Sequence, residues 1–128
     1  MINMIDVVAA YIEQDNKILL FQRPTHKARG LQWEFPGGKI EPGETPSQAL
    51  IRECQEELDI TVSVVEELAR TVHGYPDITI DLTLLRCQIE WGTPKLREHI
   101  AMAKVSRAEA LLLDLAPADR KLLEKVSF

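Results

Sequence analysis

Four glutamates in the middle of the chain have spacings that suit metal and phosphate chemistry. Glu44 follows Gly38 after five intervening residues, and Glu53, Glu56 and Glu57 come next. Carboxylate oxygens are the ligands that Mg²⁺ prefers, and this ion usually binds through a few carboxylates together with substrate phosphates. We therefore interpret the cluster as a candidate site for a divalent metal and a phosphate group. The alternative interpretation is the solvated acidic face of a helix.

A helix over residues 45–58 is expected to position these glutamates. Thr45 is a good N-cap, Pro46 suits the first helical position, and Gln48 completes a capping box. At about 100° per residue, the apolar residues fall within one arc and the last three glutamates within the adjoining arc. The apolar arc holds Leu50, Ile51, Cys54 and Leu58. Because glutamates at these helical spacings repel one another, a cation is expected between them.

The full spacing resembles the signature of the Nudix hydrolases. That signature reads Gly, five residues, Glu, seven residues, and then Arg-Glu-apolar-x-Glu-Glu-x-Gly-apolar. The chain matches it at Gly38, Glu44, Arg52, Glu53, Cys54, Glu56, Glu57 and Ile60. One position departs, because Asp59 stands where the family has glycine. Asp adopts the left-handed conformation at a cost of about 1 kcal/mol, so the departure concerns the loop after the helix and not the glutamates.

The resemblance extends over nearly the whole chain and is closest to the MutT-like branch of the family. It is carried by VVAAYIEQDNKILLFQRP at 7–24, WEFPGGKIEPGE at 33–44 and LAPADRKLLEK at 115–125. It implies a nucleoside triphosphate pyrophosphohydrolase, which cleaves between the α and β phosphorus atoms and releases nucleoside monophosphate and pyrophosphate. The leading implied role is sanitising the nucleotide pool of 8-oxo-dGTP, a form of DNA repair. The alternative substrate is CTP or a modified dCTP.

The resemblance also implies a site for Mg²⁺, with Mn²⁺ able to substitute. The implied ligands are the Gly37 carbonyl, Glu53, Glu56, Glu57 and Glu98, the last from the loop 95–99. Metal bound there lowers the pKa of an attacking water and neutralises charge on the phosphates. Either Glu53 or Glu98 is implied as general base, and the sequence leaves this choice open. Arg52 is implied to orient the glutamates by ion pairing.

Five further residues are candidates for binding substrate. Arg23 and Lys39 can contact phosphate, although each can also be a solvated surface charge. Phe35 and Tyr75 can stack on the base, or belong to the core or the pocket rim. Asp119 matches a base-contacting position of the family, although an Asp in the first turn of a helix is favourable by itself. An ionised Asp only accepts hydrogen bonds, which favours cytosine N4 or guanine N1–H and N2 as partners.

Composition limits the remaining function classes. The 128 residues are enough for one domain, 1–128, that buries about two thirds of its unfolded surface. The net charge of −5 gives no basic footprint for duplex nucleic acid. No signal peptide precedes the first strand, and no apolar run reaches the ~20 residues that span a membrane. We expect a cytoplasmic monomer or homodimer that binds nucleoside triphosphates and neither membrane nor duplex.

Isolated residues carry less information. Cys54 and Cys87 lie in apolar contexts and are predicted to be buried reduced thiols. The three histidines, His26, His73 and His99, are isolated in the sequence and are predicted to be exposed. A rival interpretation of the whole chain is a non-catalytic Nudix-like binding module. Such modules lack several motif glutamates, whereas this chain has them all.

The periodicity of apolar residues predicts an α/β fold. A hairpin, further strands and two C-terminal helices surround the helix at 45–58, and the resemblance implies an α/β/α sandwich with a mixed sheet. A change in apolar phase also predicts a bulge near 84–85. The predicted strands are 4–12, 17–21, 62–72, 78–89 and 100–105, and the predicted helices after 58 open at Ser106 with Glu109 as a capping box and at Pro117, the latter running to about Lys125.

Overall fold

The computed structural model describes residues 4–126, so residues 1–3 and 127–128 of the predicted domain lie outside the described part of the chain. It has the α/β class that the sequence predicts. In chain order the elements are β1 (Met4–Gln14), β2 (Lys17–Gln22), β3 (Trp33–Glu34), β4 (Gly37–Lys39), α1 (Pro46–Leu58), β5 (Thr61–Gly74), β6 (Thr79–Trp91), β7 (Ala101–Val105), α2 (Arg107–Leu111) and α3 (Pro117–Lys125).

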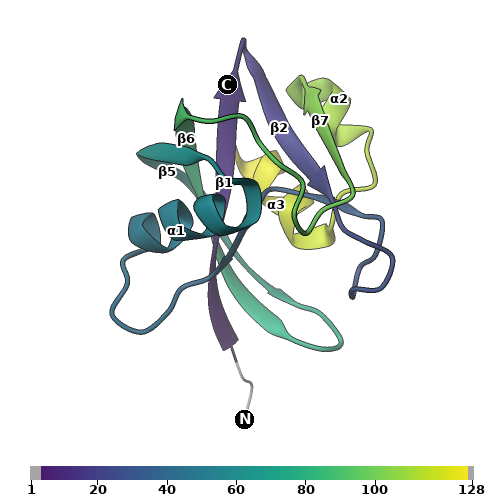
Figure 1. Cartoon of the computed structure of the whole chain (residues 1–128). Helices are drawn as coiled ribbons and strands as arrows, with labels where there is room; N and C mark the ends of the chain where they lie inside the picture. Colours follow the sequence, from purple (N-terminus) through teal and green to yellow (C-terminus); the bar gives the residue numbers. More distant parts are fainter. Residues whose placement is uncertain (1–3, 127–128) are drawn as a thin grey trace.

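The sheet is mixed, as predicted, and it divides along β1. The strand order is β3-β2-β1-β6-β5, with β4 also paired to β1 and β7 to β2. β1 and β6 are parallel, whereas the other pairs are antiparallel. β1 pairs with β2 only at Glu13 and Gln14, and with β4 from Val7 to Ala9. Figure 1 shows β1 and β2 diverging from their shared turn.

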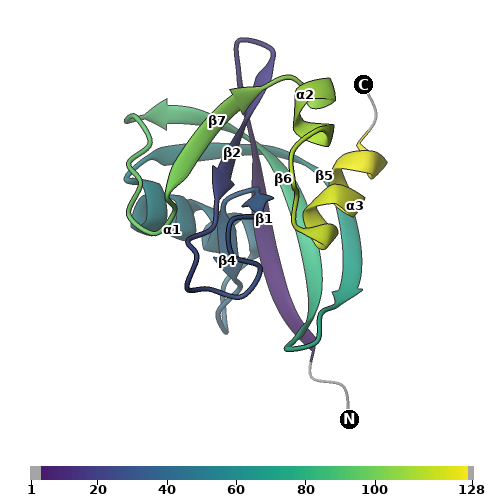
Figure 2. The same ribbon diagram turned by 90° about the vertical axis from the view of Figure 1, so that its right-hand side faces the viewer.

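Helices cover both faces of the sheet, which gives the expected α/β/α sandwich. Figure 2 shows α1 on one side of the strands and α2 with α3 on the other. Successive residues of β1 point to opposite faces. Val8 and Ala10 therefore pack in the core beneath α1, whereas Ala9 and Tyr11 pack in the core beneath α3. Burial of the middle of β1 on both faces was expected from its continuous apolar run.

The predicted helix caps are confirmed. The Thr45 side chain accepts from the Gln48 N–H while the Gln48 side chain accepts from the Thr45 N–H, and Ser106 and Glu109 form the same box at α2. α3 begins at Pro117. The two cysteines are buried and free, also as predicted.

Asp59 ends α1 in the left-handed conformation, with φ 54° and ψ 42°. Its N–H donates to the carbonyls of Cys54 and Gln55, and its carboxylate lies 3.0 Å from Lys95 Nζ. The side chain that replaces the family's glycine therefore joins the end of α1 to the loop that carries Glu98.

The predicted bulge near 84–85 is in the neighbouring strand. β6 stays in register with β1 from Thr79 to Cys87, whereas β5 has an irregularity between Glu67 and Ala69, opposite Leu84 and Leu85. The apolar phase changes in β6 for another reason. Leu84 packs in the core beneath α3 and Leu85 in the core beneath α1, so both faces of the strand are buried at this point.

Candidate active site

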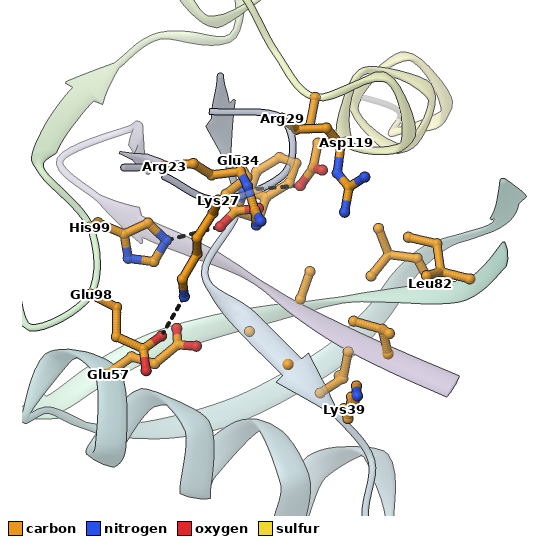
Figure 3. Close-up of a pocket in the computed structure, with 18 of the residues that line it drawn as sticks. Arg23, Lys27, Arg29, Glu34, Lys39, Glu57, Leu82, Glu98, His99 and Asp119 are labelled. Atoms are coloured by element: carbon orange, nitrogen blue, oxygen red, sulfur yellow. Dashed lines mark hydrogen bonds and ion pairs between the residues drawn. The ribbon is translucent and has the colours of Figure 1, made fainter. Parts of the chain in front are cut away.

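A cavity of about 250 Å³ lies where the sheet divides. Its walls come from β1, β4, β6, the end of α1, the start of α3 and the loops 23–32 and 95–99 (Figure 3). The predicted site residues that line it are Arg23, Phe35, Gly37, Lys39, Glu57, Tyr75, Glu98 and Asp119. The other three, Arg52, Glu53 and Glu56, do not line the cavity.

Glu57 is the buried carboxylate at one end of the cavity. It extends from α1, and its Oε2 has no hydrogen-bond partner among the described residues. Burial, reinforced by the nearby charges of Glu53, Glu98 and Glu34, raises the pKa of Glu57 to about 9. Glu98 approaches from its loop and, in Figure 3, lies beside Glu57. The helix and the loop therefore bring the carboxyl groups of Glu57 and Glu98 together, and the charge of Glu98 disfavours ionisation of Glu57.

Arg52 binds three of the motif glutamates outside the cavity. Its Nε and Nη2 donate to the two oxygens of Glu44 at 2.8 and 2.9 Å. Its Nη1 donates to Glu53 at 2.9 Å and to Glu56 at 3.3 Å, and Nη2 also donates to the Lys39 carbonyl at 3.0 Å. Such a two-pronged contact fixes the geometry of a carboxylate. Arg52 thus joins the motif loop to α1 without reaching the cavity.

The donors at this end fit a hard divalent cation. They are carboxylate oxygens, and one of them is buried with no partner among residues 4–126. Gly38 provides room for Glu53, because a Cβ at Gly38 would lie 2.4 Å from the Glu53 carboxyl carbon. No three acidic, His or Cys side chains in the described part of the chain are already close enough together to hold a metal. Glu56 and Glu98 have side chains that are 60% and 51% exposed, so both have freedom to turn toward Glu57.

The predicted phosphate contacts differ in their surroundings. Arg23 is held in place, with Nε donating to the Ala28 carbonyl at 2.8 Å and Nη1 to Glu34 Oε1 at 3.0 Å. Lys39 is exposed and lines the rim of the cavity. Lys27, which the sequence did not single out, extends across the opening, and its Nζ lies 3.7 Å from Glu98 Oε2 (Figure 3).

The aromatic candidates stand at the other end of the cavity. Phe35 is buried and packs against Tyr11 with ring centroids 5.9 Å apart. The guanidinium of Arg29 lies 4.0 Å above the Tyr75 ring, and the Tyr75 hydroxyl accepts from the Ala118 N–H at 2.9 Å. Tyr75 is therefore fixed at both its ring and its hydroxyl.

Asp119 is buried in the first turn of α3 and lines the same end. Its Oδ1 accepts from the Phe35 N–H at 3.0 Å. Burial, and next the charge of Glu34, raise the pKa of Asp119 to about 8. The sequence suggested an ionised carboxylate that only accepts, but burial makes the protonated form, which can also donate, available near neutral pH.

The prediction that all three histidines are exposed was wrong for His99. Its side chain is 5% exposed, its Nε2 lies 2.9 Å from Glu34 Oε2, and its ring packs on Phe21. His73 is half-buried, whereas His26 is exposed. Sequence reasoning also missed Glu34, which binds both Arg23 and His99. The sequence clue that could have found them is that each lies next to a predicted site residue: Glu34 precedes Phe35, and His99 follows Glu98.

Comparisons with known proteins show which family has this fold. A family model described as the NUDIX domain matches residues 3–126. The CTP pyrophosphohydrolase of Escherichia coli (strain K12) is 46% identical over 121 residues, covering 94% of this chain and 90% of that protein. The putative 8-oxo-dGTP diphosphatase 2 of Mycobacterium tuberculosis (strain CDC 1551 / Oshkosh) is 37% identical over 124 residues, covering 94% and 85%. The solution structure of the E. coli ORF135 protein has a TM-score of 0.84 at 44% identity, covering 97% of this chain and 89% of that one.

The α/β/α sandwich and the family match place this chain in the class of the Nudix-type hydrolases. The chain belongs to the NUDIX family, and it is an enzyme of the Nudix hydrolase type. Within residues 4–126, none of the helices has the length and apolar character that crossing a membrane requires.

Proposed function

We propose that this enzyme is a Mg²⁺-dependent nucleoside triphosphate pyrophosphohydrolase that forms nucleoside monophosphate and pyrophosphate. The observation that carries the proposal is the buried carboxyl group of Glu57, whose Oε2 has no hydrogen-bond partner among the described residues and which lies with Glu98 at the end of the cavity opposite Asp119 (Figure 3). One end of this cavity suits a metal with phosphates, and the other suits a base. The activities named for the two relatives are of the same kind.

Metal binding is assigned to Glu53, Glu56, Glu57, Glu98 and the Gly37 carbonyl. A divalent ion bound there supplies a more acidic water and a counter-charge for the phosphate oxygens. Mn²⁺ has similar ligand preferences and is proposed as a substitute.

The protein's own groups account for the remaining steps. A carboxylate of Glu53 or Glu98 takes a proton from the attacking water, whose oxygen then bonds to phosphorus as the bond to the bridging oxygen breaks. Both residues remain candidates for this base. Arg52 keeps Glu53 oriented, and Arg23 and Lys39 offset negative charge on the triphosphate. Electrostatic stabilisation of this kind is usually the largest part of such catalysis.

The base is proposed to lie between Phe35, Tyr75 and Asp119. 8-oxo-dGTP is the leading candidate, because Asp119 in its two protonation states can pair with both donors and carbonyl acceptors of an oxidised purine. CTP or a modified dCTP is the second candidate, and the 46% identity to the CTP pyrophosphohydrolase favours it. Cytosine offers Asp119 its N4 donor and its O2 acceptor.

A product analysis tests the proposal. The purified protein is incubated with Mg²⁺ and each of CTP, dCTP, GTP, dGTP and 8-oxo-dGTP, and phosphorus NMR identifies the products. The proposal requires monophosphate and pyrophosphate, and kcat/KM across the panel ranks the bases. Formation of diphosphate and inorganic phosphate would contradict it. Nucleotide binding without turnover would instead support the non-catalytic binding module.

A further inference from the structure

The loop that carries Glu98 has few buried contacts of its own. In the stretch from Gly92 to Ile100, His99 is the one residue that is buried, and Glu98 and Ile100 on either side of it are each 51% exposed. A loop with so few buried groups is expected to be mobile unless particular contacts fix it. The position of Glu98 therefore depends on what holds its chain neighbours.

Backbone hydrogen bonds hold the loop at Lys95 and at Ile100, whose N–H groups donate to the carbonyls of Leu58 and Gln22. Between them, two side-chain anchors flank Glu98. On one side, Arg97 Nη1 lies 3.3 Å from the carbonyls of both Gln55 and Glu56, at the end of α1. On the other side, His99 Nε2 lies 2.9 Å from Glu34 Oε2. A carboxylate only accepts hydrogen bonds, so we assign the Nε2 proton to His99 as the donor.

The anchor at His99 is specific in both its polar and its apolar contacts. The ring packs against Phe21 of β2 with centroids 5.4 Å apart. Its other nitrogen, Nδ1, is buried with no hydrogen-bond partner among the described residues, so Glu34 is the polar partner that sets the ring's direction. Figure 3 shows His99 pointing to Glu34 while Glu98, the next residue, points to Glu57.

Glu34 itself is fixed, which makes it a useful support. Its second oxygen accepts from Arg23 Nη1 at 3.0 Å, and its strand, β3, pairs with β2. Removing an outer partner that orients a ligand of a metal site typically lowers activity or metal affinity by about 10- to 100-fold.

We propose that His99 is a positioning residue, which holds Glu98 over Glu57 through its hydrogen bond to Glu34. The inference rests on the role that the proposed function gives to Glu98. His99 also lines the cavity, but the role assigned to it is to act through its neighbour and not by binding substrate or metal.

The test compares His99→Gln with His99→Asn. The Gln amide can place an N–H where Nε2 lies, whereas the shorter Asn amide reaches only the place of Nδ1. We expect His99→Asn to lower kcat about 10- to 100-fold and to raise the Mg²⁺ concentration for half-maximal activity, with a KM for nucleotide within about threefold of wild type. His99→Gln should retain most of the activity. Ile100→Ala, a change at the exposed neighbour, is the matched control and should be neutral.

A double-mutant cycle separates positioning from general stability. In a Glu98→Gln background, His99→Asn should cause no further loss of kcat, because the group that it positions is already gone. A further loss of similar size would overturn the inference, and so would equal, near-normal activity of the Asn and Gln variants. If thermal melting shows that His99→Asn is not folded, His99→Phe takes its place, because it keeps a ring packed on Phe21. Full activity of Glu98→Gln alone would instead contradict the proposed function.

Discussion

Arg52 and Glu44 form a two-pronged ion pair, in which Nε–Oε2 and Nη2–Oε1 are 2.8 and 2.9 Å apart. The two residues are eight positions apart and belong to α1 and to the motif loop. The pairing explains why an arginine and a glutamate occur at this spacing together with the carboxylates of the cavity. It fixes the loop that follows β4, the strand of Gly37 and Gly38, against the helix that contains Glu57.

Loss of this pair should lower both activity and the stability of the protein at neutral pH. Arg52 depresses the pKa of Glu44 to about 2, from an ordinary value near 4.5. A depressed carboxyl stabilises the fold above its unfolded pKa, and this contribution disappears as the pH falls through the folded pKa. The melting temperature of wild type should therefore exceed that of Glu44→Gln above about pH 5, and the two should converge near pH 2. Equal melting curves at pH 7 would contradict the assignment.

Replacing Glu57 by Gln should abolish the effect of Mg²⁺ on the melting temperature. The Gln side chain keeps the shape of Glu57 and removes a carboxyl group whose pKa is raised to about 9 in the fold, a shift that lowers stability at neutral pH. The metal-free variant should therefore melt at the same or a higher temperature than wild type. Mg²⁺ should raise the melting temperature of wild type and not that of Glu57→Gln, because a ligand stabilises only a state that binds it. Activity should fall by roughly 100-fold or more. An equal Mg²⁺ shift in both proteins would remove Glu57 from the metal site.

Asp119 should make the protein less stable as the pH rises, which is opposite to the effect of Glu44. Its pKa is raised to about 8 in the fold, whereas the unfolded value is near 3.8. The folded state therefore holds a proton that the unfolded state releases, and stability falls as the pH rises from about 4 through about 8. Asp119→Asn removes this titration and keeps an oxygen for the Phe35 N–H. Wild type should lose melting temperature relative to the variant between pH 5 and pH 9, and parallel profiles would exclude the raised pKa.

The same substitution should change the choice of base. The asparagine amide would offer a fixed donor and a fixed acceptor, whereas Asp119 exchanges these roles with its proton. We expect Asp119→Asn to shift the kcat/KM ratio of 8-oxo-dGTP to CTP by about 10-fold in one direction, the scale of one buried hydrogen bond. Tyr75→Phe, which removes a hydroxyl bonded to Ala118, serves as the control for a general change of the pocket. A constant ratio across both variants would leave Asp119 as a structural residue of the α3 first turn.

Local signals were the ones that the sequence made visible. Thr45 and Gln48 of the capping box are three positions apart, so its geometry follows from the two residue types and their spacing. Glu53, Glu56 and Glu57 are equally local, because α1 carries all three. Asp59 also behaves as its residue type predicts, in the left-handed conformation.

Contacts between distant segments were not visible. His99 and Glu34 are 65 residues apart, and their pairing depends on β2, which pairs with β3 and also with β7, the strand that follows the Glu98 loop. A histidine without a neighbouring histidine or cysteine gives no signal of its own, so its burial was missed. The bulge was predicted in β6 because consecutive apolar residues in a sequence can indicate either a bulge or a strand that is buried on both faces. The raised pKa of Asp119 likewise depends on packing of α3 that a sequence does not display.

The motif carboxylates are proposed to catalyse metal-dependent release of pyrophosphate, and one measurement tests this role most directly. It is Mg²⁺-stimulated pyrophosphate release from a nucleoside triphosphate by wild type and by Glu53→Gln, with circular dichroism to check that both are folded. We predict release by wild type that stops when the metal is chelated, and a loss of roughly 100-fold or more in the folded variant. Near-normal turnover by Glu53→Gln, or wild-type turnover that persists in chelator, would contradict this role.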